Sequence, residues 1–160
     1  MKRLTLILVL VALGGTAVQA GAQSYYKKET SLFLEIFGNG GEASANLEKL
    51  LGETISLKVG FGLTGVVYRK GFVVPFGGSL MFGGRENKIE IGAGGAWVDI
   101  DDNGTDDTYL DVQEDQWVAN GVAGYRFLGD YGFTFRLAYT PAYTKDGLQH
   151  MGGAILGYSF

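Results

Sequence analysis

The sequence predicts an all-β protein, a closed antiparallel up-and-down transmembrane β-barrel of about eight strands. Three observations support this fold class. Glycine accounts for 27 of 160 residues, roughly 17% against a typical ~7%. Charged residues make up only 19% of the chain, below the usual quarter of a soluble protein. Segments of about ten residues alternate large apolar with small or polar side chains, which is typical of membrane-spanning strands.

The N-terminus has the three-part pattern of a secretory signal peptide. Met1-Lys2-Arg3 is a basic start, Leu4–Leu13 is an apolar run, and small residues follow as far as Ala22. The apolar run is shorter than the ~18 residues of a membrane helix and ends at Gly14-Gly15, which favours cleavage over an uncleaved anchor. We therefore predict a signal peptide over residues 1–22 and an outer-membrane β-barrel domain over residues 23–160.

The clearest expected strand is Ile55–Thr64. Its odd-numbered residues are all large and apolar, whereas its even-numbered residues are serine, lysine, glycine and threonine. A period of two places the two sets on opposite faces of a strand. The same pattern predicts eight strands, over Thr30–Gly38, Ala43–Leu50, Ile55–Val66, Phe72–Phe82, Lys88–Val98, Gln116–Phe127, Phe133–Tyr143 and Met151–Phe160.

The second and fourth of these segments carry the weakest strand signals. Leu47, Leu50 and Leu51 also have helical spacing, so a helix over Ala43–Leu51 is the competing interpretation. Pro75 removes a backbone donor from the fourth segment, which suggests a β-bulge there.

The polarity of the two faces favours a membrane barrel over a soluble one. The bulky apolar faces are continuous and end in aromatic residues, whereas the opposite faces hold glycine, serine, threonine and a few charges. This is the inside-out arrangement of a transmembrane barrel, with apolar side chains toward lipid. The alternative is a soluble β-protein whose glycines mark bends.

The lengths of the connections fit the same topology. With a periplasmic N-terminus, the even-numbered connections at Leu51–Thr54, Gly83–Asn87 and Leu128–Gly132 are short periplasmic turns, and the long fifth connection, Asp99–Asp115, faces outward. Aromatic girdles are expected at both interfaces. The external girdle contains Trp97, Trp117 and Tyr143, and the periplasmic girdle contains Phe127, Tyr131, Phe133, Tyr158 and Phe160.

The end of the chain resembles the C-terminal strand of bacterial outer-membrane proteins. It reads Ala154-Ile-Leu-Gly-Tyr158-Ser-Phe160, with a terminal phenylalanine and apolar or aromatic residues at alternate positions before it. The resemblance implies a small barrel of about eight strands whose last strand is read by the barrel assembly machinery. The glycine-rich segment Phe37-Gly-Asn-Gly-Gly41 also resembles uncharacterised small barrels of Bacteroidota-type bacteria.

Residues capable of catalysis are sparse. His150 is the one histidine of the sequence, and it lies near the outer end of the last expected strand. A nucleophilic site needs a base, a nucleophile and an orienting group together. Barrel deacylases pair histidine and serine on one strand, but Met151-Gly152-Gly153 follows here. Asp146 and the acidic connection Asp99–Asp115 are conceivable partners, although no spacing singles them out, so we interpret His150 as a solvated loop residue.

The acidic fifth connection is the other candidate site. Asp99-Ile-Asp101-Asp-Asn103-Gly104 matches the start of a calcium-binding loop. Such a loop needs a bidentate acid at its twelfth position, which is Leu110 here, with Asp111 one residue later. We therefore favour an acidic, solvated external loop and predict no metal or other cofactor.

Strand parity directs six charged side chains into the barrel. Buried charges persist when they are paired, and an eight-stranded barrel is just wide enough to be filled by side chains. The sequence thus predicts a salt-bridged interior and no open pore, although some of these groups could instead be hydrated near the rims. The six residues are Glu35, Glu48 and Glu90 with Lys58, Arg126 and Arg136.

These observations predict a non-enzymatic integral outer-membrane β-barrel with a structural or surface-interaction role. Its expected partners are outer-membrane lipids and the barrel assembly machinery. The net charge of −4 disfavours nucleic-acid binding through phosphate neutralisation, and the absence of cysteine excludes disulfides and thiolate sites. The alternatives are a narrow channel or porin for small solutes, a lipid-modifying barrel enzyme using His150, and a soluble periplasmic ligand-binding barrel.

Overall fold

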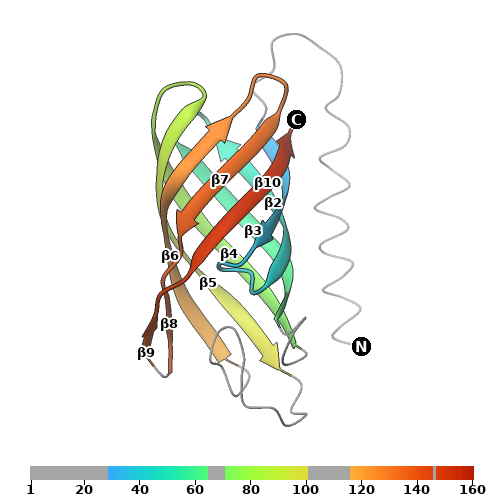
Figure 1. Ribbon diagram of the computed structural model, residues 1–160, viewed down its shortest axis with the longest axis vertical. Helices are drawn as coiled ribbons and strands as arrows, with labels where there is room; N and C mark the ends of the chain where they lie inside the picture. The colour runs from blue at the N-terminus through green and yellow to red at the C-terminus, as the bar shows by residue number, and fades with distance from the viewer. Residues whose placement is uncertain (1–28, 65–70, 101–115, 146) are drawn as a thin grey trace.

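The computed structural model describes residues 29–64, 71–100, 116–145 and 147–160. Within these ranges the chain forms ten β-strands, arranged around a single axis (Figure 1). No helix in the described ranges is long and apolar enough to cross a membrane. The strands are β1 Thr30–Ile36, β2 Ala43–Leu51, β3 Ile55–Thr64, β4 Gly71–Gly83, β5 Asn87–Ile100, β6 Gln116–Leu128, β7 Phe133–Tyr139, β8 Ala142–Thr144, β9 Gly147–Gln149 and β10 Gly152–Ser159.

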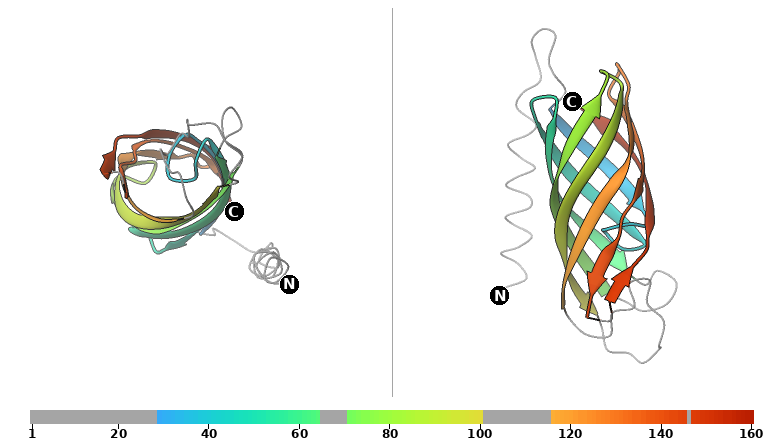
Figure 2. Two further views of the ribbon diagram at one scale, coloured as in Figure 1. Left: turned by 90° about the horizontal axis from the view of Figure 1, so that it is seen from below. Right: turned by 90° about the vertical axis from the view of Figure 1, so that its left-hand side faces the viewer.

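The sheet closes on itself. Its order is β5-β4-β3-β2-β1-β10-β7-β6, every neighbouring pair is antiparallel, and β5 also pairs with β6. Viewed from below, the strands form a ring (Figure 2, left). Closure removes the unpaired edges that an open sheet would expose. The predicted fold class, a closed antiparallel up-and-down β-barrel, is confirmed.

The ten strands form an eight-stranded barrel, as predicted, because two pairs of consecutive strands each act as one longer strand. Strands β7 and β8 continue each other across Pro141, whose carbonyl oxygen accepts a hydrogen bond from the Gly121 amide at 2.8 Å. Strands β9 and β10 continue each other in the same way, because the Thr140 amide donates to the Met151 carbonyl oxygen at 2.9 Å. The two short strands therefore extend the last hairpin beyond the ring (Figure 1).

The strands are staggered around the ring. Following paired residues once around the barrel from Arg126 leads back to β6 at Gln116, ten residues away. A stagger of this kind tilts the strands against the axis, by about 35–45° in typical barrels, and sets the diameter. With eight strands, the interior is just wide enough for side chains to fill it.

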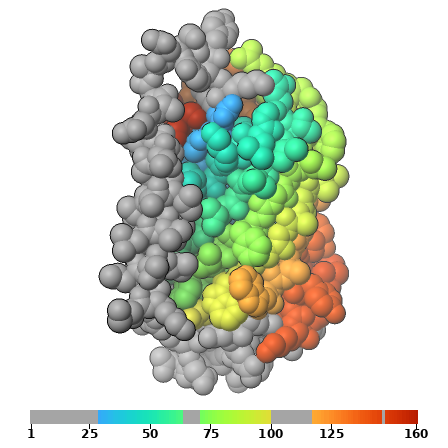
Figure 3. All heavy atoms as spheres, turned by 180° about the vertical axis from the view of Figure 1, so that it is seen from behind, coloured from blue at the N-terminus to red at the C-terminus, as the bar shows by residue number. Residues whose placement is uncertain are grey.

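Large apolar side chains cover the outside of the barrel. The burial pattern alternates along β1, where Ser31, Phe33 and Glu35 are buried while Leu32 and Leu34 are exposed. Leu34 is 65% exposed. The side chains of β2, β3 and β4 form one continuous wall (Figure 3). The predicted assignment of the apolar faces to the outside is confirmed.

Two local alternatives are settled by the strand pairing. Ala43–Leu51 is strand β2, with regular pairing to both β1 and β3, so the helical interpretation is wrong. Pro75 produces no bulge, because β4 pairs with β5 in one unbroken register. Its ladder with β3 pauses at Val74 and Pro75 and then resumes in the same register. The missing amide of Pro75 therefore interrupts one ladder without inserting a residue.

The two ends of the barrel differ. Residues 52–54, 84–86 and 129–132 form short turns at one end, called the short-turn end here. The first and last strands also meet there, because Thr30 and Phe160 exchange backbone hydrogen bonds of 3.1 and 2.8 Å. Six of the eight aromatic residues predicted for the girdles are exposed, namely Tyr131, Phe133, Tyr158 and Phe160 toward the short-turn end and Trp117 and Tyr143 toward the opposite end, whereas Trp97 and Phe127 are half-buried.

Candidate functional site

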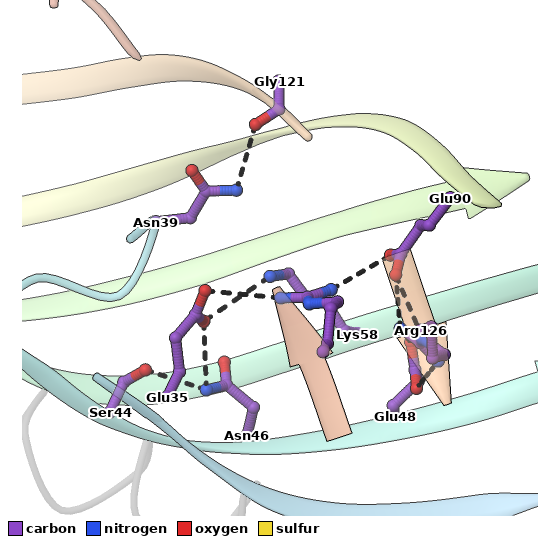
Figure 4. A network of polar contacts seen from close by, with 10 residues as sticks. Glu35, Asn39, Ser44, Asn46, Glu48, Lys58, Glu90, Gly121 and Arg126 are labelled. Carbon is purple, nitrogen blue, oxygen red and sulfur yellow. Dashed lines mark hydrogen bonds and ion pairs between the residues drawn. The ribbon is translucent and has the colours of Figure 1, made fainter. Parts of the chain in front are cut away.

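The inside of the barrel contains a layer of ion pairs, called the charged layer here. Arg126 lies at its centre and is 1% exposed. Its Nη1 and Nη2 donate to the two carboxylate oxygens of Glu48 at 2.5 and 2.9 Å, and its Nε donates to Glu90 at 3.0 Å. A planar guanidinium held by two carboxylates is a strong, geometrically specific arrangement. It ties β2, β5 and β6 together across the lumen (Figure 4).

A second guanidinium extends the layer toward β1. Arg136 Nη1 donates to Glu90 at 3.0 Å, and its Nη2 donates to Glu35 at 3.3 Å. The Lys58 ammonium lies 3.7 Å from the other oxygen of Glu35. Asn46 lies beside the same carboxylate, with its amide nitrogen 3.5 Å from it. Glu35 is therefore the group on which Arg136, Lys58 and Asn46 converge. Figure 4 shows Lys58 and Asn46 beside it.

The six charges predicted to face the interior are all buried there, and they pair as expected. Strand alternation puts them inside because each occupies the face opposite to the apolar one. Sequence reasoning missed two further buried charges, Glu42 and Lys88, each 8% exposed. For Lys88 the signal is present, because it shares the face of Glu90 on β5. Glu42 lies in the connection between β1 and β2, where alternation gives no guidance.

The half of the lumen away from the short-turn end is lined differently from the prediction. A cluster of buried apolar side chains replaces the expected polar and glycine lining. The apolar lining arises because the inward-facing positions of β4, β5 and β6 near this end are valines. The cluster consists of Val73, Ala96, Val98, Val118, Ala142 and Met151.

The segment Phe37–Glu42 folds into this half of the lumen, and we call it the inserted loop. It joins β1 to β2, and Figure 2 (left) shows it in cyan inside the ring. Asn39 at its tip is 4% exposed, and its amide nitrogen donates to the Gly121 carbonyl oxygen on β6 at 3.4 Å (Figure 4). The Gly41 amide donates to the Gly38 carbonyl oxygen at 3.2 Å, which closes the loop as a tight turn.

Glycines in the barrel wall make room for the inserted loop. A Cβ atom on Gly62 of β3 would lie 1.9 Å from the carbonyl oxygen of Gly40. A Cβ atom on Gly153 of β10 would lie 2.3 Å from the carbonyl oxygen of Phe37. Such contacts are impossible, so a side chain at either position would displace the loop. The sequence shows that these residues are glycines, but it does not show what approaches them.

His150 lies on the outside of the barrel wall between β9 and β10, where it is exposed. Its Nδ1 is hydrogen-bonded to the Tyr139 hydroxyl, and the two rings stack with centroids 5.9 Å apart. The prediction of a solvated loop histidine is correct for its exposure but misses this aromatic partner. Asp146, its conceivable acidic partner, lies outside the described residues.

The predicted calcium motif is only partly described. Asp99 lies in β5, whereas Asp101, Asn103, Gly104, Leu110 and Asp111 lie outside the described residues. Within the described ranges, no group of three or more histidine or acidic residues is placed to hold a metal ion. The absence of a metal site in this connection therefore stays a prediction.

Side chains and the inserted loop occupy the described part of the lumen at two levels. The charged layer crosses the lumen near the short-turn end, and the inserted loop and the apolar cluster occupy the other half. Opposite charges lie 2.5–3.7 Å apart within the layer, so a passing ion would have to separate them. Separating buried ion pairs is costly because each charge would be left unpaired.

Comparison with known proteins places the fold. No protein-family model matches the chain, and no curated protein matches it either. Among solved structures, it is similar to the N-terminal β-barrel domain of Pseudomonas aeruginosa OprF, with a TM-score of 0.63 and 19% identity over 82% of this chain and 96% of that one. It is also similar to a de novo designed transmembrane β-barrel, with a TM-score of 0.51 and 9% identity over 86% of this chain and 100% of the design. At these identities the likeness is one of fold, that of a small eight-stranded β-barrel.

Proposed function

We propose that this protein is a non-enzymatic integral outer-membrane β-barrel with a structural or surface-interaction role and a closed lumen. One observation carries the membrane assignment. The barrel exposes large apolar side chains around its wall while burying six paired charges inside. In water this distribution would leave most of the apolar surface solvated. In a bilayer it is the favourable arrangement, because the closed sheet pairs the backbone groups of neighbouring strands with one another.

The likeness to a designed transmembrane barrel supports the same proposal. The aromatic residues near both ends add further support, because tyrosine and tryptophan rings prefer the membrane interface. We extend the proposal to assembly: the alternating last strand, ending at Phe160, is the segment that the barrel assembly machinery reads. The outer-membrane location rests on this strand and on the predicted signal peptide at residues 1–22.

A matched pair of arginine substitutions tests the membrane assignment. Leu34 and Leu148 both face outward, and they are 65% and 57% exposed. Leu34 lies within the ring, whereas Leu148 lies in the short hairpin that extends beyond it. In a bilayer, Leu34→Arg should cost about 2–4 kcal/mol and Leu148→Arg about 0–1 kcal/mol, because the penalty depends on depth. In a soluble protein, each of the two substitutions should change the free energy of unfolding by no more than ~0.5 kcal/mol, because both sites are exposed.

Urea unfolding in lipid vesicles measures both effects. A difference between the two variants supports insertion, whereas two equally small effects would contradict it. The unsubstituted protein should also migrate differently on a detergent gel before and after boiling, as a folded membrane barrel does. A protein that folds without detergent or lipid and shows no such shift would favour the soluble ligand-binding alternative.

The closed lumen separates this proposal from a channel. In planar bilayers the unsubstituted protein should show little or no steady conductance, because the charged layer and the inserted loop both cross the lumen. Large, stable, ion-selective openings would instead support the porin alternative.

The lipid-modifying alternative predicts that the protein releases or transfers acyl chains from lipid and that replacing His150 abolishes this activity. Our proposal predicts that the unsubstituted protein has no such activity.

A further inference from the structure

The inserted loop Phe37–Glu42 fills a space that the charged layer leaves free, and it leaves and rejoins the wall at the directly paired residues Ile36 and Ala43. We propose that this loop is a displaceable plug, and that the space it fills is a blind pocket shaped for a glycine-rich peptide backbone. Such a plug lies inside the barrel and goes beyond the proposed function, because it does not depend on what surrounds the outer wall.

The shape of the pocket is the first argument. Gly62 and Gly153 form its walls at the positions where the loop backbone passes, and neither has room for a Cβ atom. The loop has the same property at Gly41, where a Cβ atom would lie 2.8 Å from the carbonyl oxygen of Leu63 on β3. At these three positions the main chain of the loop therefore contacts the main chain of the wall. A surface of this kind accepts a glycine-rich backbone and excludes chains with larger side chains.

The polar groups around the loop tip are the second argument. Asn39 makes one described side-chain hydrogen bond, the long one to Gly121. Among the described residues, three buried polar atoms in this half of the lumen have no hydrogen-bond partner, namely Asn39 Oδ1, Asn120 Nδ2 and Thr140 Oγ1. Asn120 projects inward from β6, and the buried Thr140 directly follows β7, next to the wall that Asn39 reaches. Buried donors and acceptors without partners are costly, and together they offer both kinds of group that a peptide amide requires.

The entry to the loop is the third argument. Phe37 has a φ of 51°, in the left-handed region that large side chains rarely adopt. This conformation turns the chain from the wall into the lumen, and the Phe37 ring stays exposed. Strain at the entry favours release of the loop, whereas the close fit inside favours insertion. Opposing contributions of this kind are typical of an element with two arrangements.

The charged layer makes the pocket blind. Glu35 lies directly beneath the loop, since a Cβ atom on Gly38 would lie 2.6 Å from its Oε1. Glu35 pairs with Arg136 and Lys58, which continue the layer across the lumen. Withdrawal of the loop would therefore open a cavity from one end of the barrel without creating a pore.

Cysteine labelling tests whether the plug is displaceable. The chain has no cysteine, so Asn39→Cys introduces a single thiol at the buried tip. Its reaction with a polymer-linked maleimide should be slow in the otherwise unsubstituted protein. Gly153→Ser should accelerate it by an order of magnitude or more, because the new side chain displaces the loop. Gly152→Ser is the matched control, since a Cβ atom there would meet nothing closer than 3.7 Å.

Three controls define the outcome of the labelling. Lys145→Cys supplies the rate of an exposed thiol, and the gel shift on boiling shows that each variant is folded. Labelling of Asn39→Cys as fast as Lys145→Cys would show that the loop is not seated. Equal labelling in the Gly153→Ser and Gly152→Ser backgrounds would show that the wall glycine does not hold it. Either result would overturn the plug.

A loop-shortened variant tests the pocket and its ligand class. Ile36 and Ala43 are directly paired, so an Asn-Gly turn can replace Phe37–Glu42 without changing the register. The peptide acetyl-Gly-Asn-Gly-Gly-amide should raise the unfolding temperature of this variant but not that of the full chain. The peptide acetyl-Gly-Asn-Ala-Ala-amide should raise neither. Equal effects of the two peptides, or no effect of either, would refute the glycine-backbone pocket. Steady conductance through the shortened variant would refute its blind end.

Discussion

Replacing Arg126 with methionine is the most direct test of the charged layer. All the hydrogen bonds described for the Glu48 side chain come from Arg126, at 2.5 and 2.9 Å. Glu90 also bonds to Arg126, but it keeps Arg136 at 3.0 Å after the substitution. The Arg126→Met variant therefore leaves one carboxylate, that of Glu48, buried without its guanidinium.

The structure sets the size of the expected effect. Removing one partner of a buried ion pair costs about 3–5 kcal/mol, because the remaining charge is uncompensated. Lys58 lies directly opposite Glu48 in the pairing of β2 with β3, so its ammonium is close enough to compensate in part. We therefore expect about 3 kcal/mol for Arg126→Met. Arg136→Met should cost less, about 1.5–3 kcal/mol, because Glu35 keeps Lys58 and Glu90 keeps Arg126.

Urea unfolding in lipid vesicles, followed by tryptophan fluorescence, measures these differences. The double variant Glu48→Met/Arg126→Met should recover most of the loss, since replacing a whole buried pair by apolar groups is often neutral. Lys49→Met is the control, because its pair with Glu29 is about half exposed and should contribute no more than ~1 kcal/mol. The reasoning is refuted if Arg126→Met costs no more than Lys49→Met, or if the double variant is as unstable as the single one.

Three further predictions concern the ends and the surface of the barrel. Deleting Phe160 should lower the amount of protein in the outer membrane and leave precursor or degraded chain in the periplasm; unchanged folded yield in cell fractions would argue against an assembly signal. Millimolar Ca²⁺ should not change protease cleavage within residues 101–115, and protection by Ca²⁺ that disappears in Asp101→Ala would reverse this expectation. Brominated lipids should quench Trp117, which is 66% exposed, most strongly when the bromine lies near the headgroups, and quenching strongest at the bilayer centre would contradict an interfacial girdle.

The alternation of residue types predicted most of what the barrel wall contains. Successive residues of a strand face opposite sides of the sheet. The inward positions of Glu48, Arg126 and Arg136 therefore followed from the outward positions of their neighbours. The pairing of these charges was predictable because unpaired charges are too costly inside a barrel. Which carboxylate meets which cation was not, because it depends on the ten-residue stagger around the ring. That stagger is a property of all eight strands together and leaves no local signal.

The inserted loop could not be predicted for a different reason. Alternation ends at Phe37, and a loop's direction relative to the barrel depends on space left by residues far away in the chain. The relevant signals were Gly62 and Gly153, which lie on other strands and look like ordinary interior glycines. The apolar lining near the loop was not predicted either. Val73 and Val98 lie at inward positions, but an apolar residue in a strand gives no signal by itself of which face it is on.

The distribution of the ion pairs over the chain has a consequence for the order of assembly. Glu35 and Arg136 are 101 residues apart in sequence, and Glu48 and Arg126 are 78 apart. The carboxylates of the first two strands therefore cannot meet the matching arginines until strands from the other end of the chain are in place. Contacts of such long range slow folding, because the chain must be closed before they stabilise it. The ion pairs between early and late strands thus form only when the ring closes through the pairing of β1 and β10. Until then, a partly assembled barrel is destabilised by its own unpaired charges.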